Sequence, residues 1–220
     1  MSNHSSETSG LYALLIGIDC YLPNKLPSGG YYSSLHGCVR DINHVEEFLK
    51  RRLGLSEECI LKLTAISSGS NEPSEPKDQW PTYENMVAAF QKLTDMAKSG
   101  DQVYIHYSGH GRRTKTLVPE LKGSNGLDET LVPTDIGYSE TRYLRDIEIA
   151  HLLKKMVDKG LIVTIVLDSC HSGGVTRGGN KAAVRGLGKV DTTQRPMEIL
   201  VASENELADT WWSVNLGLYS

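Results

Sequence analysis

Residues 161–174 read LIVTIVLDSCHSGG, and this stretch decides the fold class. Leu161–Leu167 is the most apolar run of the chain and predicts a strand buried on both faces. The preceding residues, Asp146–Lys159, show helical apolar spacing, with Asp146 as the predicted N-cap and Gly160 as the end. A helix that leads directly into a buried strand is typical of a parallel sheet covered by helices.

The rest of the chain repeats this alternation of strand and helix. Four further strands are predicted from apolar runs, at Tyr12–Ile18, Cys59–Ile66, Gln102–Tyr107 and Glu198–Ala202. Two further helices are predicted from apolar spacing, at Leu35–Leu53 and Tyr83–Lys98. This order predicts an α/β fold with a mostly parallel sheet and helices on both faces. Sites in such sheets form beyond the carboxyl ends of the strands.

The composition of the 220 residues excludes several classes of protein. With 39% hydrophobic residues the chain can bury a core, and no apolar run approaches the roughly 20 residues that span a bilayer. The net charge of −4 disfavours binding to nucleic acid or to an anionic membrane. Four cysteines do not make a disulfide scaffold, and the polar N-terminus lacks the pattern of a secretory signal. We therefore expect a cytoplasmic monomer.

Two strand ends carry residues that can do chemistry. His110 lies between two glycines after the strand at 102–107, and Cys170 follows the strand at 161–167. If these strands are neighbours, the two side chains share one crevice and form a Cys–His pair for thiolate attack. The backbone N–H groups of Gly111 and Cys170 would stabilise the oxyanion. A packed cysteine and a histidine in a turn remain the alternative, and His106 is expected to be structural.

The quoted motifs resemble those of a known family. YSGHG at 107–111 and DSCHSG at 168–173 resemble the catalytic motif pair of metacaspases, above all the bacterial branch called orthocaspases. LHGCVRD at 35–41 and LDETLVPTD at 127–135 resemble two supporting segments, so that the resemblance spans most of residues 12–220. It implies a caspase-like sheet and a cysteine endopeptidase that cleaves proteins or peptides after Arg or Lys. His110 would be the general base and Cys170 the nucleophile.

The resemblance also implies a pocket for a basic substrate residue. Its predicted lining is Cys38, Asp41, Ser108 and Asp168. Cys38 and Asp41 are three residues apart and so share one helix face. Two carboxylates would attract an arginine or lysine side chain and repel an aspartate. The alternative for Asp41 is an exposed acid in the first turn of a helix.

The resemblance divides the chain into three parts. Residues 1–174 would form the large catalytic unit, 175–196 a basic flexible linker, and 197–220 the start of the small unit. Because the family's sheet continues further, we expect the fold to be truncated at its C-terminus or to close differently. A zymogen-like chain would cleave its own linker after one of five basic residues, the alternative being a merely solvated loop. The candidates are Arg177, Lys181, Arg185, Lys189 and Arg195.

Calcium is predicted not to be required. Many metacaspases hold calcium with scattered acids, but this chain has Arg145-Asp146 where a pair of aspartates is expected and Arg177 where another is common. Because calcium needs several hard oxygen ligands, the loss of two of them weakens its binding. A weak site made by Asp128, Glu129 and Asp135 remains the alternative. A zinc site of His106, His110, Cys170 and His171 fits no trusted spacing.

Two rival functions remain. A catalytically idle caspase-like module would bind partners, although the presence of both Cys170 and His110 weighs against it. A legumain-like or gingipain-like relative would keep the dyad but prefer a different residue at the cleavage site.

Overall fold

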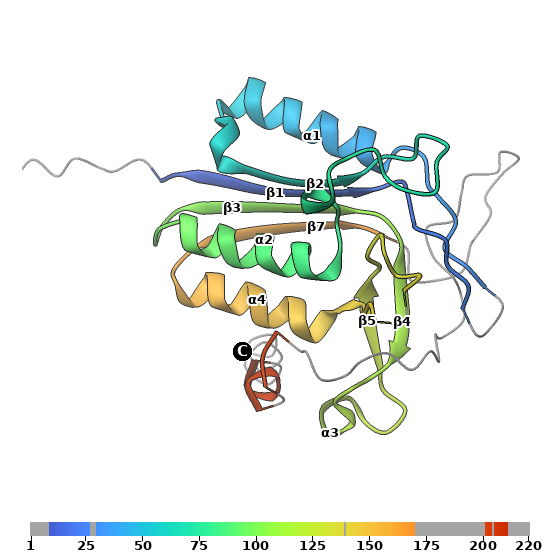
Figure 1. Cartoon of the computed structure of the whole chain (residues 1–220). Helices are drawn as coiled ribbons and strands as arrows, with labels where there is room; N and C mark the ends of the chain where they lie inside the picture. Colours follow the sequence, from blue (N-terminus) through green and yellow to red (C-terminus); the bar gives the residue numbers. More distant parts are fainter. Residues whose placement is uncertain (1–8, 27–29, 139, 170–200, 204, 211–220) are drawn as a thin grey trace, which may run out of the picture.

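A computed structural model describes residues 9–26, 30–138, 140–169, 201–203 and 205–210. Figure 1 shows a parallel sheet with α1 on one face and both α2 and α4 on the other. The strand order is β2-β1-β3-β7, and every pairing is parallel. The strands are β1 (Leu11–Ile18), β2 (Ile60–Ala65), β3 (Gln102–Ser108) and β7 (Ile162–Asp168). The long helices are α1 (Cys38–Leu53), α2 (Tyr83–Met96) and α4 (Asp146–Asp158). The predicted α/β fold class is confirmed.

The central strand β1 explains the continuous apolar runs. Ala13 and Leu15 pack with α1 through Ile42 and Leu49, whereas the alternate residues Leu14 and Ile16 join the larger core on the opposite face. All four of these β1 side chains are fully buried. Because both faces of the strand are covered, no polar alternation is present in its sequence.

Most predicted helix ends are close to the observed ones. Gly54 ends α1 in the left-handed conformation with φ 66°, which glycine adopts without steric cost. The prediction of Asp146 as N-cap of α4 is wrong, because Arg145 is the N-cap and Asp146 is the first helical residue. Arg145 is extended, as an N-cap residue and as the last residue of the short strand β6 (Leu144–Arg145), so the helix begins one position earlier than predicted.

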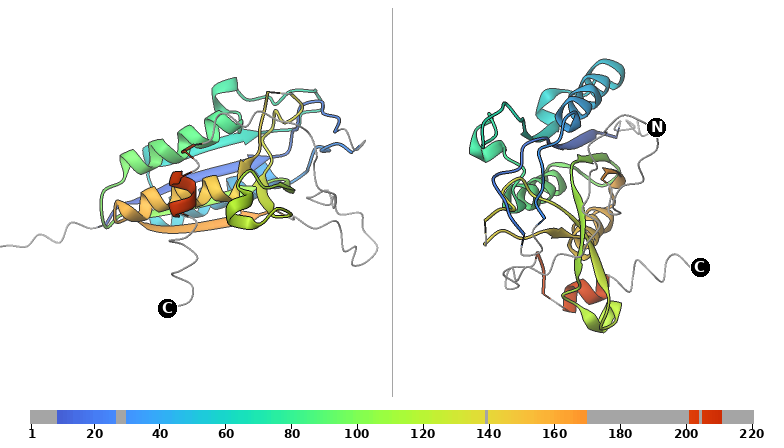
Figure 2. Two further views of the ribbon diagram at one scale, coloured as in Figure 1. Left: turned by 90° about the horizontal axis from the view of Figure 1, so that it is seen from below. Right: turned by 90° about the vertical axis from the view of Figure 1, so that its right-hand side faces the viewer.

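A second, antiparallel sheet was not anticipated. It consists of β4 (Gly111–Lys115), β5 (Leu127–Leu131) and β6, with the short helix α3 (Pro119–Lys122) between the first two strands. Figures 1 and 2 show it beside the carboxyl ends of the large sheet. Its buried positions carry polar residues, which hide the alternation of apolar and polar side chains expected of a strand. These residues are Arg112, Thr114, Asp128 and Thr130.

The smaller elements complete the described chain. Two 3₁₀ turns are present, η1 (Glu57–Cys59) and η2 (Lys77–Gln79), so the strand predicted from Cys59 begins one residue later. Val201 and Ala202 lie in a bend rather than in the predicted fifth strand, whose residues 198–200 are outside the described part. Residues 205–210 are helical and lie beside α4, where Thr210 Oγ1 is 3.1 Å from His151 Nδ1 (Figure 2). Within the described residues, no helix is long and apolar enough to cross a membrane.

Candidate active site

His110 lies at the carboxyl edge of the large sheet, two residues after β3 ends. β3 and β7 are neighbours, as the sequence argument required, and Ser108 is the register partner of Asp168. The Gly109 N–H donates to the Asp168 carbonyl oxygen at 3.3 Å, which carries the pairing past the end of the strand. The loop that bears His110 therefore lies beside the strand end that leads to Cys170.

The imidazole of His110 is held in one orientation. Its Nε2 is 2.9 Å from the Ser33 carbonyl oxygen, an acceptor, so that Nε2 carries the proton. The ring lies between two aromatic rings, with centroid distances of 4.7 Å to Tyr21 and 5.4 Å to Tyr32. The residue is only 2% exposed. In the neutral ring the lone pair is then on Nδ1, which is the nitrogen able to accept a proton.

The backbone of His110 is fixed as well. Its N–H donates to the Tyr21 hydroxyl at 2.7 Å, and its carbonyl oxygen accepts from the Tyr107 hydroxyl at 2.8 Å and from the Val132 N–H at 3.1 Å. Burial raises the pKa of both tyrosines, so they stay protonated at neutral pH. Gly109 is required for this close approach, because a Cβ there would lie 2.7 Å from Tyr107 Oη.

Two of the predicted pocket residues lie in contact. The fully buried Ser108 hydroxyl donates to Asp168 Oδ2 at 3.1 Å. Burial lowers the pKa of the neighbouring His106, while the charges of Asp168 and Asp41 both act to raise it. Both carboxylates therefore lie close enough to His106 to influence it, one from β7 and one from α1. His106 Nδ1 is 3.0 Å from the Tyr104 hydroxyl, which agrees with its expected structural role.

The other two predicted pocket residues are at the start of α1. Cys38 is fully buried in the core, and its N–H donates to Asp19 Oδ1 at 2.9 Å. Asp41 lies in the first turn, with a side chain 36% exposed and its Oδ1 3.5 Å from Arg40 Nη2. Cys38 is therefore buried, whereas the Asp41 carboxylate is accessible to solvent.

Several predicted residues lie outside the described part of the chain. They are Cys170, His171 and the five candidate cleavage residues of the linker, Arg177, Lys181, Arg185, Lys189 and Arg195. The Cys–His dyad and the proposed domain boundaries therefore stay predictions.

The residues that hold His110 were not predicted from the sequence. Tyr21, Tyr32 and Ser33 come from the long segment between β1 and α1, for which no element was predicted. Asp19, whose carboxylate accepts from the N–H of Cys38 at the start of α1, lies at the end of β1, where the rule that sites form at strand ends points. No local pattern marks the others, because their role arises from contacts with a residue about 80 positions away.

The three acids considered for a weak calcium site are not brought together. Asp128 pairs with Lys122 and Arg145, at 2.8 Å and 2.6 Å. Glu129 pairs with Arg113 at 2.9 Å, and Asp135 Oδ2 accepts from the Thr141 hydroxyl. Among the described residues, no group of three or more His, Cys, Asp or Glu side chains is placed to hold a metal ion.

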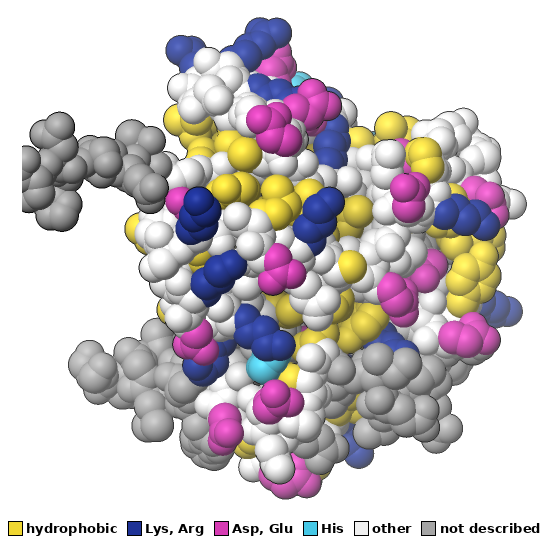
Figure 3. All heavy atoms as spheres, turned by 60° about the vertical axis from the view of Figure 1, so that its left-hand side comes forward, with side chains coloured by type: hydrophobic (Ala, Val, Ile, Leu, Met, Phe, Trp, Pro, Cys, Tyr) yellow, Lys and Arg dark blue, Asp and Glu magenta, His cyan; other side chains and the backbone are white. Residues whose placement is uncertain are grey.

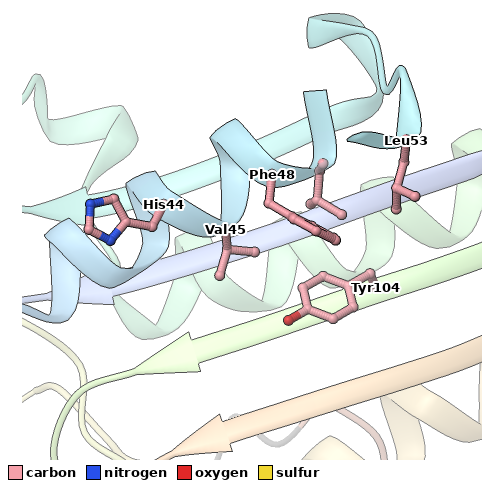
Figure 4. A pocket seen from close by; sticks show the side chains of 6 residues that line it. His44, Val45, Phe48, Leu53 and Tyr104 are labelled. Carbon is pink, nitrogen blue, oxygen red and sulfur yellow. The ribbon is translucent and has the colours of Figure 1, made fainter. Parts of the chain in front are cut away.

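A separate apolar cavity of about 330 Å³ lies between α1 and β3. Figure 4 shows His44, Val45, Phe48 and Leu53 on the helix and Tyr104 on the strand. Figure 3 shows charged side chains over the top of the molecule with hydrophobic side chains beneath them. None of the predicted site residues lines this cavity, so it is not the candidate active site.

Comparison with known proteins identifies the family. The model of the metacaspase, peptidase C14 domain matches residues 12–177, a range that includes both His110 and Cys170. The chain belongs to the metacaspase family. The match extends from β1 through the whole described metacaspase sheet and into the predicted linker.

Individual metacaspases agree with this assignment. The chain is 38% identical to metacaspase-6 of Arabidopsis thaliana over 74% of its length, and 31% identical to metacaspase-1 of Mycosarcoma maydis over 77%. It spans only 38% and 37% of those two relatives. A crystal structure of a Geobacter sulfurreducens protein matches 76% of this chain and 52% of its own, with a TM-score of 0.54 and 25% identity.

Proposed function

We propose that the chain carries the catalytic residues of a cysteine endopeptidase that cleaves proteins after Arg or Lys. The observation that carries the proposal is the orientation of His110, whose Nε2–H donates to the Ser33 carbonyl oxygen at 2.9 Å. This bond leaves Nδ1 as the basic nitrogen at the carboxyl edge of the sheet. Membership of the metacaspase family supports the same chemistry.

The reaction follows from these roles. His110 Nδ1 accepts the proton of the Cys170 thiol, and the thiolate attacks the substrate carbonyl carbon. The N–H groups of Gly111 and Cys170 stabilise the oxyanion. His110 then donates its proton to the departing amine, and water hydrolyses the thioester while His110 again accepts a proton.

The specificity for a basic residue is supported by the two carboxylates near His106. Asp168 and Asp41 offer negative charge to a guanidinium or an ammonium group, and the Ser108 hydroxyl fixes the Asp168 carboxylate through its 3.1 Å hydrogen bond. An aspartate substrate side chain would be repelled. Cys38 would contribute as a buried wall of this pocket.

Self-cleavage in residues 175–196 belongs to the same proposal, with a zymogen-like monomer in the cytoplasm as the form that is processed. The five basic residues of this segment match the proposed specificity. Purified chain should be cut within 175–196, whereas the Cys170→Ala variant should stay intact. If the wild-type chain and the Cys170→Ala variant both stay intact, self-processing is refuted, whereas the peptidase assignment is not affected.

The main test is release of a fluorophore from peptides that end in Arg, Lys, Asp or Asn. Turnover after Arg or Lys, lost in Cys170→Ala, is expected. Turnover only after Asp or Asn would overturn the pocket while preserving the dyad. No turnover by a folded chain would favour an idle binding module.

A further inference from the structure

A cluster of four charged side chains, three of them buried and that of Asp146 31% exposed, joins α3 and two strands of the second sheet to α4. Lys122 ends α3, Asp128 lies on β5, Arg145 ends β6, and Asp146 begins α4. The side chain of Asp128 is completely buried, and those of Lys122 and Arg145 are only 7% and 10% exposed. Buried charges of this kind are stable only when each is paired.

The Lys122 ammonium lies in a cage of oxygen atoms. Its Nζ is 2.8 Å from Asp128 Oδ1, 2.7 Å from each carboxylate oxygen of Asp146, and 3.5 Å from the Leu127 carbonyl oxygen. Two carboxylates and a carbonyl are the hard oxygen ligands that a divalent cation such as calcium prefers. Here an ammonium group occupies the centre of that set.

Arg145 completes the charge balance. Its Nη1 lies 2.6 Å from Asp128 Oδ2 and donates to the Lys115 carbonyl oxygen at 3.0 Å. Two side-chain cations therefore neutralise the two carboxylates. A divalent cation brought to the same position would meet Lys122 and Arg145 at close range, so the residues present do not fit a resident calcium ion.

The cluster is connected to the backbone of His110 through β4 and β5. It ties the β4–β5 hairpin to the start of α4, with the Glu129 N–H donating to Asp146 Oδ2 at 3.2 Å. β4 begins at Gly111, directly after His110, and the residue after β5, Val132, donates to the His110 carbonyl oxygen. Figure 1 shows α4 beginning beside β5. Loosening the hairpin would therefore loosen the backbone of His110.

We propose that the Lys122 ammonium, assisted by Arg145, is a built-in replacement for a divalent cation and anchors the hairpin that positions His110. The fold around His110 is then complete without calcium. This inference does not rest on the proposed cleavage specificity, because its primary readout is the stability of the chain.

The test is the melting temperature of the full chain in excess EDTA and in millimolar calcium. The wild-type protein should melt at the same temperature in both. Lys122→Met should melt about 10 °C lower in EDTA, because the two carboxylates of Asp128 and Asp146 then share one cation, and calcium should restore a large part of that loss. Lys154→Met, which breaks an exposed pair with Asp158 on α4, is the matched control. It should melt close to the wild-type temperature both in EDTA and in calcium.

A second variant keeps the proposal testable if Lys122→Met does not fold in EDTA. Lys122→Met combined with Arg145→Asp offers three carboxylates, and it should bind calcium in titration calorimetry and melt higher with it. A wild-type chain stabilised by calcium would overturn the proposal. So would a Lys122→Met variant that melts with the wild type, or a double variant that calcium does not affect.

Discussion

Ser108 and Asp168 lie opposite each other in the parallel pairing of β3 and β7, and the Ser108 hydroxyl donates to Asp168 Oδ2 at 3.1 Å. This contact couples the last residue of the strand before His110 to the last residue of the strand before Cys170. It fixes one carboxylate at the edge of the sheet, next to the two motifs that are proposed to be catalytic. The pairing of these two strands thus brings together segments that are about 60 residues apart.

Replacing Asp168 tests its part in substrate recognition. Asp168→Asn should lower kcat/KM for Arg and Lys peptides by about 10- to 100-fold, since a hydrogen bond to a charged group contributes roughly 1.5–3 kcal/mol. The melting temperature should change little. Asp158→Asn, an exposed acid paired with Lys154, is the control. Unchanged preference for Arg and Lys in Asp168→Asn would remove this carboxylate from the pocket.

Removing the Tyr21 hydroxyl tests the support of the His110 backbone. Tyr21→Phe leaves the buried His110 N–H without its 2.7 Å acceptor and should cost about 1–3 kcal/mol in the free energy of unfolding. It should also lower kcat, because the backbone that positions the imidazole loses one of its hydrogen bonds. Tyr31→Phe, at a residue that is 62% exposed, should alter neither quantity. Denaturant titration and steady-state kinetics measure both effects, and equal behaviour of the two variants would argue against the assigned contact.

A methyl group at Gly109 should disturb the active site directly. In Gly109→Ala the new Cβ would lie 2.7 Å from Tyr107 Oη and 3.0 Å from Tyr21 Oη, the two hydroxyls that hold His110. Because small displacements of a catalytic group can reduce rates about 100-fold, we expect at least a tenfold loss of kcat. Gly69→Ala meets open space and strains only a backbone at φ 86°, so it should keep its activity. A fully active Gly109→Ala would contradict the described packing.

The stability of the fold should fall in mild acid because of His106. Burial lowers the pKa of its imidazole in the folded state, so the unfolded chain binds the proton more readily. The contribution of neutral His106 to the free energy of unfolding is therefore complete above the unfolded pKa of about 6.5. It is lost as the pH falls from there toward the lower folded pKa. His106→Gln should flatten the decline in unfolding free energy between pH 7 and 5.

His151 provides an independent check of the same argument. Burial also lowers its pKa, with the neighbouring Lys155 charge acting in the same direction. His151→Gln should by itself flatten the pH dependence of the unfolding free energy. The double variant should show the sum of the two effects, since the two histidines lie on different elements. A His106→Gln profile parallel to that of the wild type would show that the histidine titrates alike in both states.

The hydrophobic pattern alone predicted the main sheet and its helices. Runs such as Leu161–Leu167 and the spacing in Tyr83–Lys98 report local preferences and two-sided burial, and the observed β7 and α2 lie within two residues of the predicted ends. His110 was also identified from local sequence, because it follows a buried strand and has a glycine on each side. The same motifs led to the metacaspase family, which the comparison of the domain shows.

Only the tertiary structure revealed the second sheet and the contacts that hold His110. β4 and β5 bury Arg112 and Asp128, which a sequence pattern assigns to the surface, because their partners come from other elements. Tyr21 and Ser33 carry no local signal, since each acts through a contact with a distant residue. Periodicity records which face of an element is buried, whereas pairings between charges and hydrogen-bonding groups depend on which elements meet in three dimensions.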